Sequence, residues 1–272
     1  MTYKSPLIWV GGKFFQRQKI VNLFPLHNLY CEVFGGAGHI LFAKTPAKVE
    51  IYNDINGNLV NFFMVARDRT EELIERLDSL PYARSLYQRW KNEPLPDDSI
   101  ERAVRWFYIL HSSFAGVYGT GWAFGKTDSL AQKFRSNIDK IKAVRERLKN
   151  VQIDNLDFRV CIPRYDTENT LFYIDPPYDG QKSKKDYYNN KHTPIDSFTE
   201  QDHRELADLL NNIKGKAIIS YYPTELINSL YPNDRWNRIH YTLALASQKS
   251  ANKERSNEML LLNYKQEQTR LL

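Results

Sequence analysis

A short apolar run ends in two prolines that are flanked by an acid and an aromatic ring. Residues 171–178 read Leu-Phe-Tyr-Ile-Asp-Pro-Pro-Tyr, and the first four predict a buried strand. Because prolines fix φ and donate no backbone hydrogen bond, Asp175 and Tyr178 should project from a stiff turn at the strand's carboxyl end. A carboxylate, a free carbonyl and an aromatic face together can hold a planar ring by its NH2 group and its flat side. The same residues also form ordinary structural turns.

A glycine pair followed by a lysine lies near the amino terminus. Residues 9–13 read Trp-Val-Gly-Gly-Lys, and a helical pattern follows from about residue 14 to 23. A nucleotide P-loop is excluded, because Leu7 stands in place of its first glycine and Phe14 replaces the Ser or Thr after its lysine. Lys13 could neutralise a ligand carboxylate, or it could be a surface lysine after a turn.

A second glycine-rich turn follows a strand predicted over residues 29–34. It reads Gly35-Gly36-Ala37-Gly38 and opens a helix that should run to about residue 44. Strand, glycine turn and helix in this order bring backbone against a cofactor in Rossmann-like folds. The NAD pattern fails, because Leu41 takes the place of the third glycine of GxGxxG.

The next predicted strand, 49–53, leads directly into Asp54. This acid lies about 20 residues past the glycine turn, where an acid takes the ribose hydroxyls of a bound nucleoside. It could also cap the helix that should start near residue 55, and the two roles are compatible.

Residues 71–150 have a helical, charged pattern without a parallel-strand signal, so we expect an insertion into an α/β domain. Its centre, 113–126, carries four glycines among aromatic residues. This composition predicts a loop, which either carries recognition or is anchored by its aromatic side chains. A basic helix should follow over 136–149.

The sheet resumes at 151–158, where Asp157 and Phe158 would offer an acceptor and a ring to an adenine, or form an edge turn. The charged, tyrosine-rich segment 179–190 should be a mobile flap over the site. A helix capped by its first residue is expected over 199–212.

Three further strands are expected, over 216–221, 238–245 and 258–263, with the last two antiparallel. A polar, basic loop joins those two strands, and it carries Lys249, Lys253 and Arg255.

The composition limits the classes of protein. The chain has 272 residues, 42% of them hydrophobic, and a net charge of +6 with a pI near 9.1, which suits a polyanionic partner without requiring one. Its two cysteines, Cys31 and Cys161, show no metal-ligand or disulfide spacing, so no metal is expected. Without an apolar signal core or a run of about 18 apolar residues, we expect a cytoplasmic protein with no membrane partner.

Taken in chain order, the motifs resemble those of Dam-type (D12 class, alpha-group) DNA adenine-N6 methyltransferases. The matching stretches are 9–13, 34–38, 53–56, 156–158, 175–178 and 198–200, so the resemblance spans nearly the whole chain. It implies an α/β fold, a Rossmann-like S-adenosylmethionine-dependent methyltransferase sheet with helices on both faces. The catalytic domain would comprise 1–70 and 151–272, and a mainly helical target-recognition domain would be inserted at 71–150.

The resemblance also implies roles for single residues, with S-adenosyl-L-methionine as cofactor. Trp9 and Lys13 would contact its methionine moiety, and Asp54 would take its ribose hydroxyls. The cofactor-binding set is Trp9, Gly12, Lys13, Phe34, Gly35, Gly36, Gly38, Asp54, Asp157, Phe158 and Asp175. The catalytic set that would hold the target adenine is Asp175, Pro176, Pro177 and Tyr178. The DNA-binding set is Tyr118, Thr120, Trp122, Phe124, Lys126, Lys249, Lys253 and Arg255.

The implied chemistry fits the proline turn. Hydrogen bonds from the adenine NH2 group to the Asp175 carboxylate and the Pro176 carbonyl would favour a nucleophilic nitrogen that attacks the sulfonium methyl in line. The target adenine would flip out of the duplex, at a cost of a few kcal/mol, and stack on Tyr178. The loop at 115–119 lacks the arginine with which GATC-specific members read guanine, which argues against GATC as the target.

Other functions stay open at this point. Methylation of RNA adenine or of cytosine N4 uses the same amine chemistry. A DNA-binding module without catalysis is disfavoured by the intact Asp175 and Lys13, and a nicotinamide oxidoreductase by Leu41. The expected partners are double-stranded DNA and a cognate restriction endonuclease.

Overall fold

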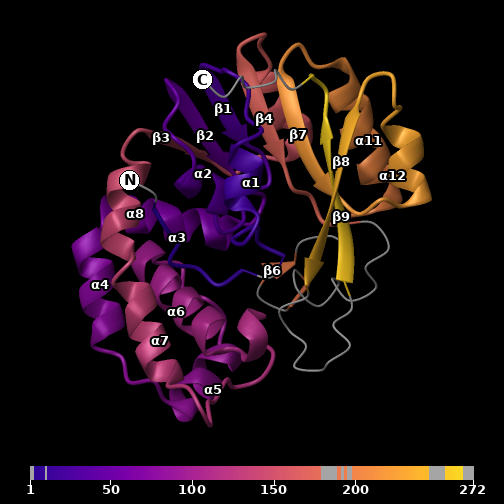
Figure 1. Cartoon of the computed structure of the whole chain (residues 1–272). Helices are drawn as coiled ribbons and strands as arrows, with labels where there is room; N and C mark the ends of the chain where they lie inside the picture. The colour runs from indigo at the N-terminus through magenta and orange to yellow at the C-terminus, as the bar shows by residue number, and fades with distance from the viewer. Residues whose placement is uncertain are drawn as a thin grey trace, which may run out of the picture.

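The computed structural model describes residues 3–9, 11–178, 189–190, 193–194, 198–244 and 255–265. Its centre is a seven-stranded sheet of order β3-β2-β1-β4-β7-β9-β8 (Figure 1). The strands of this sheet are β1 Leu29–Glu32, β2 Val49–Asn53, β3 Val151–Asp154, β4 Thr170–Ile174, β7 Lys216–Tyr221, β8 Asn237–Ala244 and β9 Arg255–Leu262. The five adjacent strands β3, β2, β1, β4 and β7 pair in parallel, and β9 lies antiparallel between β7 and β8. A separate short pair is formed by β5 Asn189–Asn190 and β6 Thr193–Pro194.

Eleven α-helices are described in the same parts of the chain. They are α1 Arg17–Val21, α2 His39–Ala43, α3 Gly57–Asp68, α4 Thr70–Asp78, α5 Arg84–Asn92, α6 Ser99–Ser112, α7 Leu130–Ile138, α8 Ile141–Leu148, α9 Phe158–Tyr165, α11 Glu200–Asn212 and α12 Glu225–Leu230, with a short 3-10 helix η1 at Phe114–Gly116.

The parallel strands are apolar on both sides because helices cover both faces of the sheet. In β4, Leu171 and Tyr173 belong to one buried cluster while Phe172 and Ile174 belong to the other. The first cluster includes residues of α1 to α8, and the second includes residues of α9, α11 and α12. This arrangement confirms the predicted α/β sheet with helices on both faces.

Strand order reverses at β1, which has β2 on one side and β4 on the other. Crevices outside the carboxyl ends of such strands bind ligands in open α/β sheets. The glycine turn 35–38 follows β1 at this edge, and the Asp175 turn follows β4 beside it. The sheet therefore brings two of the sequence motifs together.

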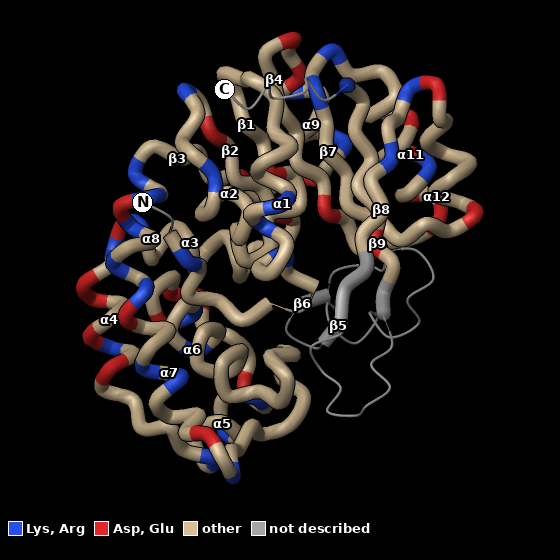
Figure 2. Tube along the Cα trace, viewed as in Figure 1, with Lys and Arg blue, Asp and Glu red and all other residues tan. Residues whose placement is uncertain are grey.

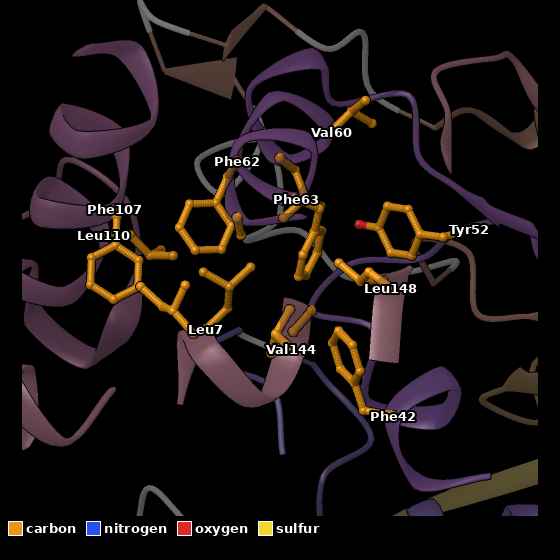
Figure 3. Close-up of a cluster of buried hydrophobic side chains, with 14 of the residues drawn as sticks. Leu7, Phe42, Tyr52, Val60, Phe62, Phe63, Phe107, Leu110, Val144 and Leu148 are labelled. Atoms are coloured by element: carbon orange, nitrogen blue, oxygen red, sulfur yellow. The ribbon is translucent and has the colours of Figure 1, made fainter. Parts of the chain in front are cut away.

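Helices α4 to α8 lie between α3 and β3 in the chain and pack against the sheet through a shared core. Phe62 of α3 stacks on Phe107 of α6, with ring centroids 5.3 Å apart. Phe63 of α3 meets Tyr52 of β2 at 5.0 Å and Phe42 of α2 at 5.8 Å. Figure 3 shows these rings converging from the sheet and from the inserted helices. Helices α4 to α8 thus share one core with the α/β part.

A buried ionic cluster adds a second attachment. Glu50 of β2 accepts from Arg147 of α8 at 2.8 Å and from Lys44 at 2.5 Å, and Arg147 also donates to the Leu41 carbonyl at 2.9 Å. Removing one member of a buried ion pair would leave the other charge buried without a partner, which is strongly unfavourable. This cluster therefore holds α8 against β2 and α2.

Several predicted elements were confirmed, including strand 49–53 as β2 and helix 199–212 as α11. In α11, Thr199 and Asp202 form a capping box. The helix expected over 14–23 is the shorter α1, and the basic helix expected over 136–149 is two helices, α7 and α8.

The strand expected over 151–158 was predicted too long, since β3 stops at Asp154. Asp157 caps α9 by accepting from the Arg159 backbone N–H at 2.8 Å, so Phe158 begins a helix instead of ending a strand. Helix α12 was not predicted. The predicted flap, 179–190, lies outside the described residues except for β5.

Candidate active site

The Asp175 turn leaves β4 at the carboxyl edge as predicted. Tyr178 folds back so that its hydroxyl donates to Asp175 Oδ1 at 3.2 Å. Burial and the neighbouring Asp175 carboxylate raise the pKa of Tyr178, so its phenol keeps the proton that it donates. The rings of Tyr178 and Tyr222 pack edge-to-face, with their centroids 4.6 Å apart. Pro176 and Pro177 thus hold a carboxylate beside an oriented aromatic ring.

Lys13 reaches this turn from the amino-terminal segment. Its Nζ lies 2.8 Å from Asp175 Oδ1 and 4.9 Å from the centre of the Tyr178 ring, and it donates to the Gly11 carbonyl at 3.1 Å. The side chain is only 4% exposed, and that of Asp175 is 17% exposed. The interpretation of Lys13 as a surface lysine was therefore wrong.

Asp54 stabilises the glycine turn at 35–38 through hydrogen bonds. Its carboxylate accepts from the Gly36 N–H at 2.8 Å and from the Asn56 N–H at 2.8 Å. Burial raises its pKa to about 6. The interpretation of Asp54 as the cap of the next helix was wrong, because Asn56 caps α3 through its own side chain.

The glycines of both turns allow close approach by aromatic side chains. A Cβ on Gly36, where φ is +50°, would lie 2.9 Å from Trp9 Nε1, and one on Gly12 would lie 2.8 Å from a carbon of His39. Such contacts are shorter than real Cβ atoms tolerate. Trp9 therefore packs against the glycine turn, and Gly12 against the helix that follows it.

Three phenylalanines gather near the end of β1. The ring of Phe34 lies 5.9 Å from that of Phe158 and 5.8 Å from that of Phe198, and the last two are 5.6 Å apart. Asp157 is half-exposed beside them and pairs with Arg159 at 3.1 Å. The structure thus brings together Phe34 and Phe158, two of the residues predicted to bind the cofactor.

Glu32 was missed in the sequence. It lies at the end of β1, where its carboxylate accepts from the Tyr30 hydroxyl and from the Leu41 N–H, both at 2.8 Å. The second contact gives a hydrogen-bond acceptor to a backbone N–H in the first turn of α2. The residue that caps this helix, Gly38, has no side chain that could accept it. Burial raises the pKa of Glu32 to about 8. The sequence feature that could have indicated a buried carboxylate is this single acid at the end of an otherwise apolar strand.

The glycine-rich loop is held closed by its backbone. Ser113 and Trp122 form an antiparallel bridge, and the Phe114 N–H donates to the Gly121 carbonyl at 2.6 Å. Tyr118 is buried and stacks on Trp106 at 6.3 Å. Trp122 packs 4.6 Å from Tyr82.

Tyr118 and Trp122 therefore anchor the loop. The sequence had left two interpretations of this loop open, recognition and anchoring by aromatic side chains, and these two residues fit the second. Of the other predicted DNA contacts on the loop, Thr120, Phe124 and Lys126 are exposed. Lys249 and Lys253 lie outside the described residues, and Arg255 begins β9 with its side chain also outside them.

The basic excess is spread over the surface. Figure 2 shows both signs of charge on the inserted helices. Arg135 pairs with Asp78 at 2.9 Å, Lys149 with Glu146 at 2.7 Å, and Arg145 with Glu71. The inserted helices thus neutralise part of their own positive charge.

The family model described as D12 class N6 adenine-specific DNA methyltransferase matches residues 9–245. The chain belongs to this family. This membership confirms the predicted resemblance, the Rossmann-like methyltransferase fold and the predicted enzyme class, which is site-specific methylation of DNA adenine at N6.

Individual relatives of this D12 class enzyme are distant but cover nearly its full length. It is 26% identical over 277 residues to the type II methyltransferase M1.LlaDCHI of Lactococcus lactis subsp. cremoris, with 94% of each chain covered. It is 23% identical over 266 residues to the DNA adenine methylase of Escherichia coli K12, with 94% of each covered. The type II methyltransferase M.MjaIII of Methanocaldococcus jannaschii is 23% identical, with 97% of this chain and 100% of the relative covered.

Membership separates the alternatives that the sequence left open. RNA adenine, cytosine N4, a silent DNA-binding module and a nicotinamide oxidoreductase all differ from the family's description. A methyl transferase also requires a methyl donor. Over the described ranges, no three His, Cys, Asp or Glu side chains gather in a way that could hold a metal ion, and no helix there has the length and apolar character to span a membrane.

Proposed function

We propose that this D12 class enzyme uses S-adenosyl-L-methionine to methylate an adenine flipped out of duplex DNA, with the amine bound at Asp175 and Pro176. The observation that carries the proposal is the placement of the Asp175 carboxylate, next to Lys13, at the carboxyl edge of the sheet. That edge also carries the Gly36 turn, so donor and acceptor sites would adjoin.

The residues at the glycine turn fit the proposed cofactor. Each carboxylate oxygen of Asp54 already accepts one backbone N–H, and each retains a second lone pair for a ribose hydroxyl. Phe34, Phe158 and Asp157 would flank the adenine ring, while Trp9, Gly12 and Lys13 would bind the methionine end. When bound, S-adenosyl-L-methionine supplies an electrophilic methyl group on a sulfonium.

The chain's own residues would make the adenine amine nucleophilic. The Asp175 carboxylate and the Pro176 carbonyl would accept from the NH2 group, which opposes delocalisation of its lone pair into the ring. Tyr178 would stack on the base and, through its bond to Asp175 Oδ1, orient the carboxylate. As positive charge develops on the nitrogen, the carboxylate would stabilise it.

We propose that 71–150 is the target-recognition domain and that 1–70 with 151–272 is the catalytic domain. The loop exposes two large apolar rings, Phe114 at 67% and Phe124 at 63%. Stacking of bases on such rings contributes about 1–3 kcal/mol each, which would offset the cost of flipping. Since residues 115–119 contain no arginine, we propose a target other than GATC.

We also propose that the enzyme works beside a cognate restriction endonuclease, because two relatives that span nearly the whole chain are named type II methyltransferases. An endonuclease that cuts the sequence methylated here would support the pairing.

The proposed function is tested by incubating plasmid DNA with the enzyme and S-adenosyl-L-methionine, followed by modification-sensitive sequencing. We expect N6-methyladenine in one sequence context. Asp175→Ala should abolish transfer while DNA binding persists, and the exposed-acid control Asp208→Ala should behave as wild type. Methylation by the Asp175 variant, or binding of NAD in place of S-adenosyl-L-methionine, would contradict the proposal.

A further inference from the structure

A second buried carboxylate faces Lys13. Glu258 of β9 places its Oε2 3.9 Å from Lys13 Nζ, and its side chain is 9% exposed. Tyr241 of β8 donates its hydroxyl to the same oxygen at 3.0 Å. One ammonium is therefore flanked by two carboxylates, those of Asp175 and Glu258, which arrive from different strands.

The sheet fixes where Glu258 lies. It is paired with Tyr241 in the β8–β9 ladder, and its neighbour Met259 is paired with Tyr221 of β7. Met259 faces the second buried cluster, whereas Leu260 faces the first. Because side chains alternate along a strand, Glu258 shares its face with Leu260. Burial and the Glu258 carboxylate raise the pKa of Tyr241, so the phenol remains a donor to Glu258.

Asp175 Oδ1 already has two donors. Lys13 Nζ already lies 2.8 Å from Asp175 Oδ1, and Tyr178 donates to that oxygen as well. These two donors use both lone pairs of Oδ1, so an adenine NH2 group that binds at Oδ1 would displace Lys13. A buried ammonium that loses its partner is strongly disfavoured unless another carboxylate receives it.

We propose that the adenine amine binds at Asp175 Oδ1 and that Glu258 is a positioning residue that receives the displaced Lys13, an inference that rests on the proposed function. A shift of Lys13 Nζ by about 1 Å turns its 3.9 Å contact with Glu258 into a hydrogen bond of ordinary length. Tyr241 holds the receiving oxygen in place. The Lys13 ammonium thus has two positions, one beside Asp175 and one beside Glu258. It occupies the position beside Glu258 when the adenine enters.

A purely structural role for Glu258 leads to different results. Removal of a structural carboxylate would change the melting temperature and would act independently of Lys13. Removal of a positioning carboxylate changes the rate of methyl transfer and does so only while Lys13 is present. The two roles are separated by combining variants.

The test compares single-turnover methylation of DNA by wild type and by Glu258→Gln, which keeps the shape and an oxygen for Tyr241 but removes the charge. We expect a 10-fold to 100-fold lower rate with DNA affinity changed less than 2-fold. In a Lys13→Gln background, the same substitution should change the residual rate less than 2-fold. Tyr241→Phe should give a smaller loss, and the exposed control Glu225→Gln none.

Two results would overturn the inference while leaving the proposed function intact. One is a wild-type single-turnover rate for Glu258→Gln, and the other is an equal loss in the presence and absence of Lys13. A wild-type enzyme that fails to methylate DNA with S-adenosyl-L-methionine would instead overturn the proposed function, and this inference with it.

Discussion

The ammonium of Lys13 lies 2.8 Å from the Asp175 carboxylate, although one follows a glycine pair near the amino terminus and the other ends the central strand β4. Both side chains are largely removed from water, so each depends on the other for its charge to be tolerated. This pair therefore joins the amino-terminal motif to the proline turn.

Lys13→Met should both destabilise and inactivate the enzyme. Loss of the ammonium leaves Asp175 poorly solvated, so we expect about 2 kcal/mol lower stability in urea unfolding and at least 100-fold slower methyl transfer. The double variant Lys13→Met with Asp175→Asn should regain most of the stability but no activity. A single variant as stable as wild type would show that the pair carries little energy.

Asp54→Asn should weaken cofactor binding without affecting DNA binding. An amide can donate where the carboxylate only accepts, so we expect at least 10-fold lower affinity for S-adenosyl-L-methionine in calorimetry. Because the pKa of Asp54 is about 6, wild-type affinity should fall as pH drops through 6, while the variant should lack this dependence. Asp68→Asn, an exposed acid on α3, is the control. Equal affinity at pH 7 would remove Asp54 from the cofactor site.

Gly36→Ala should damage the cofactor turn. Its φ of +50° disfavours a side chain, and the new Cβ would displace Trp9. We expect about 1 kcal/mol lower stability from the backbone and at least 10-fold weaker cofactor binding. Gly57→Ala is the matched control, since its Cβ would meet Asn155 at an ordinary 3.5 Å in the first turn of α3. If both variants bind alike, the close approach at Gly36 is unimportant.

The proline turn and the glycine turn could be predicted because their constraints are local. Proline geometry places Asp175 at a strand end, and Gly36 has a φ that other residues avoid. Glu258 could not be predicted, because its position depends on β9 inserting between β7 and β8, and a shift of one residue would turn it to the other face.

In the aromatic loop, the sequence does not determine which side chains are buried. Its glycines predict irregular backbone, but nothing local distinguishes Tyr118, which is buried, from Phe124, which is exposed. Which ring turns inward is decided by the partners that the fold supplies, such as Trp106 beneath Tyr118. The role of Asp157 could not be predicted either, since the end of a strand and the cap of a helix use the same residue types.

The exposed rings of the loop should contribute to DNA binding. Phe124→Ala and Phe114→Ala should each weaken binding of duplex DNA about 5-fold to 20-fold, as expected for lost stacking contacts, with melting temperatures unchanged. Leu26, which is 95% exposed and lies on the segment between α1 and β1, provides the control Leu26→Ala. Fluorescence anisotropy with labelled DNA measures the affinities. Full binding by both loop variants would exclude these rings from the interface.

Glu32→Gln should stabilise the enzyme at high pH. Burial raises the pKa of Glu32 from 4.5 to about 8, so the unfolded chain loses this proton at lower pH than the folded one. The associated stability is complete below pH 4.5 and is lost as pH rises to 8. Glutamine carries no proton to lose and can still accept from Tyr30 and Leu41.

The stability gained by the glutamine variant should therefore grow between pH 5 and 8 and level off above it, reaching on the order of 5 kcal/mol. Urea unfolding at several pH values measures the difference. Glu225→Gln, which makes the same chemical change at an exposed position of α12, should stay within about 0.5 kcal/mol of wild type throughout. A gain for Glu32→Gln that does not vary with pH would mean that the buried carboxylate is ionised at all these values, and that Tyr30 and Leu41 suffice to hold its charge.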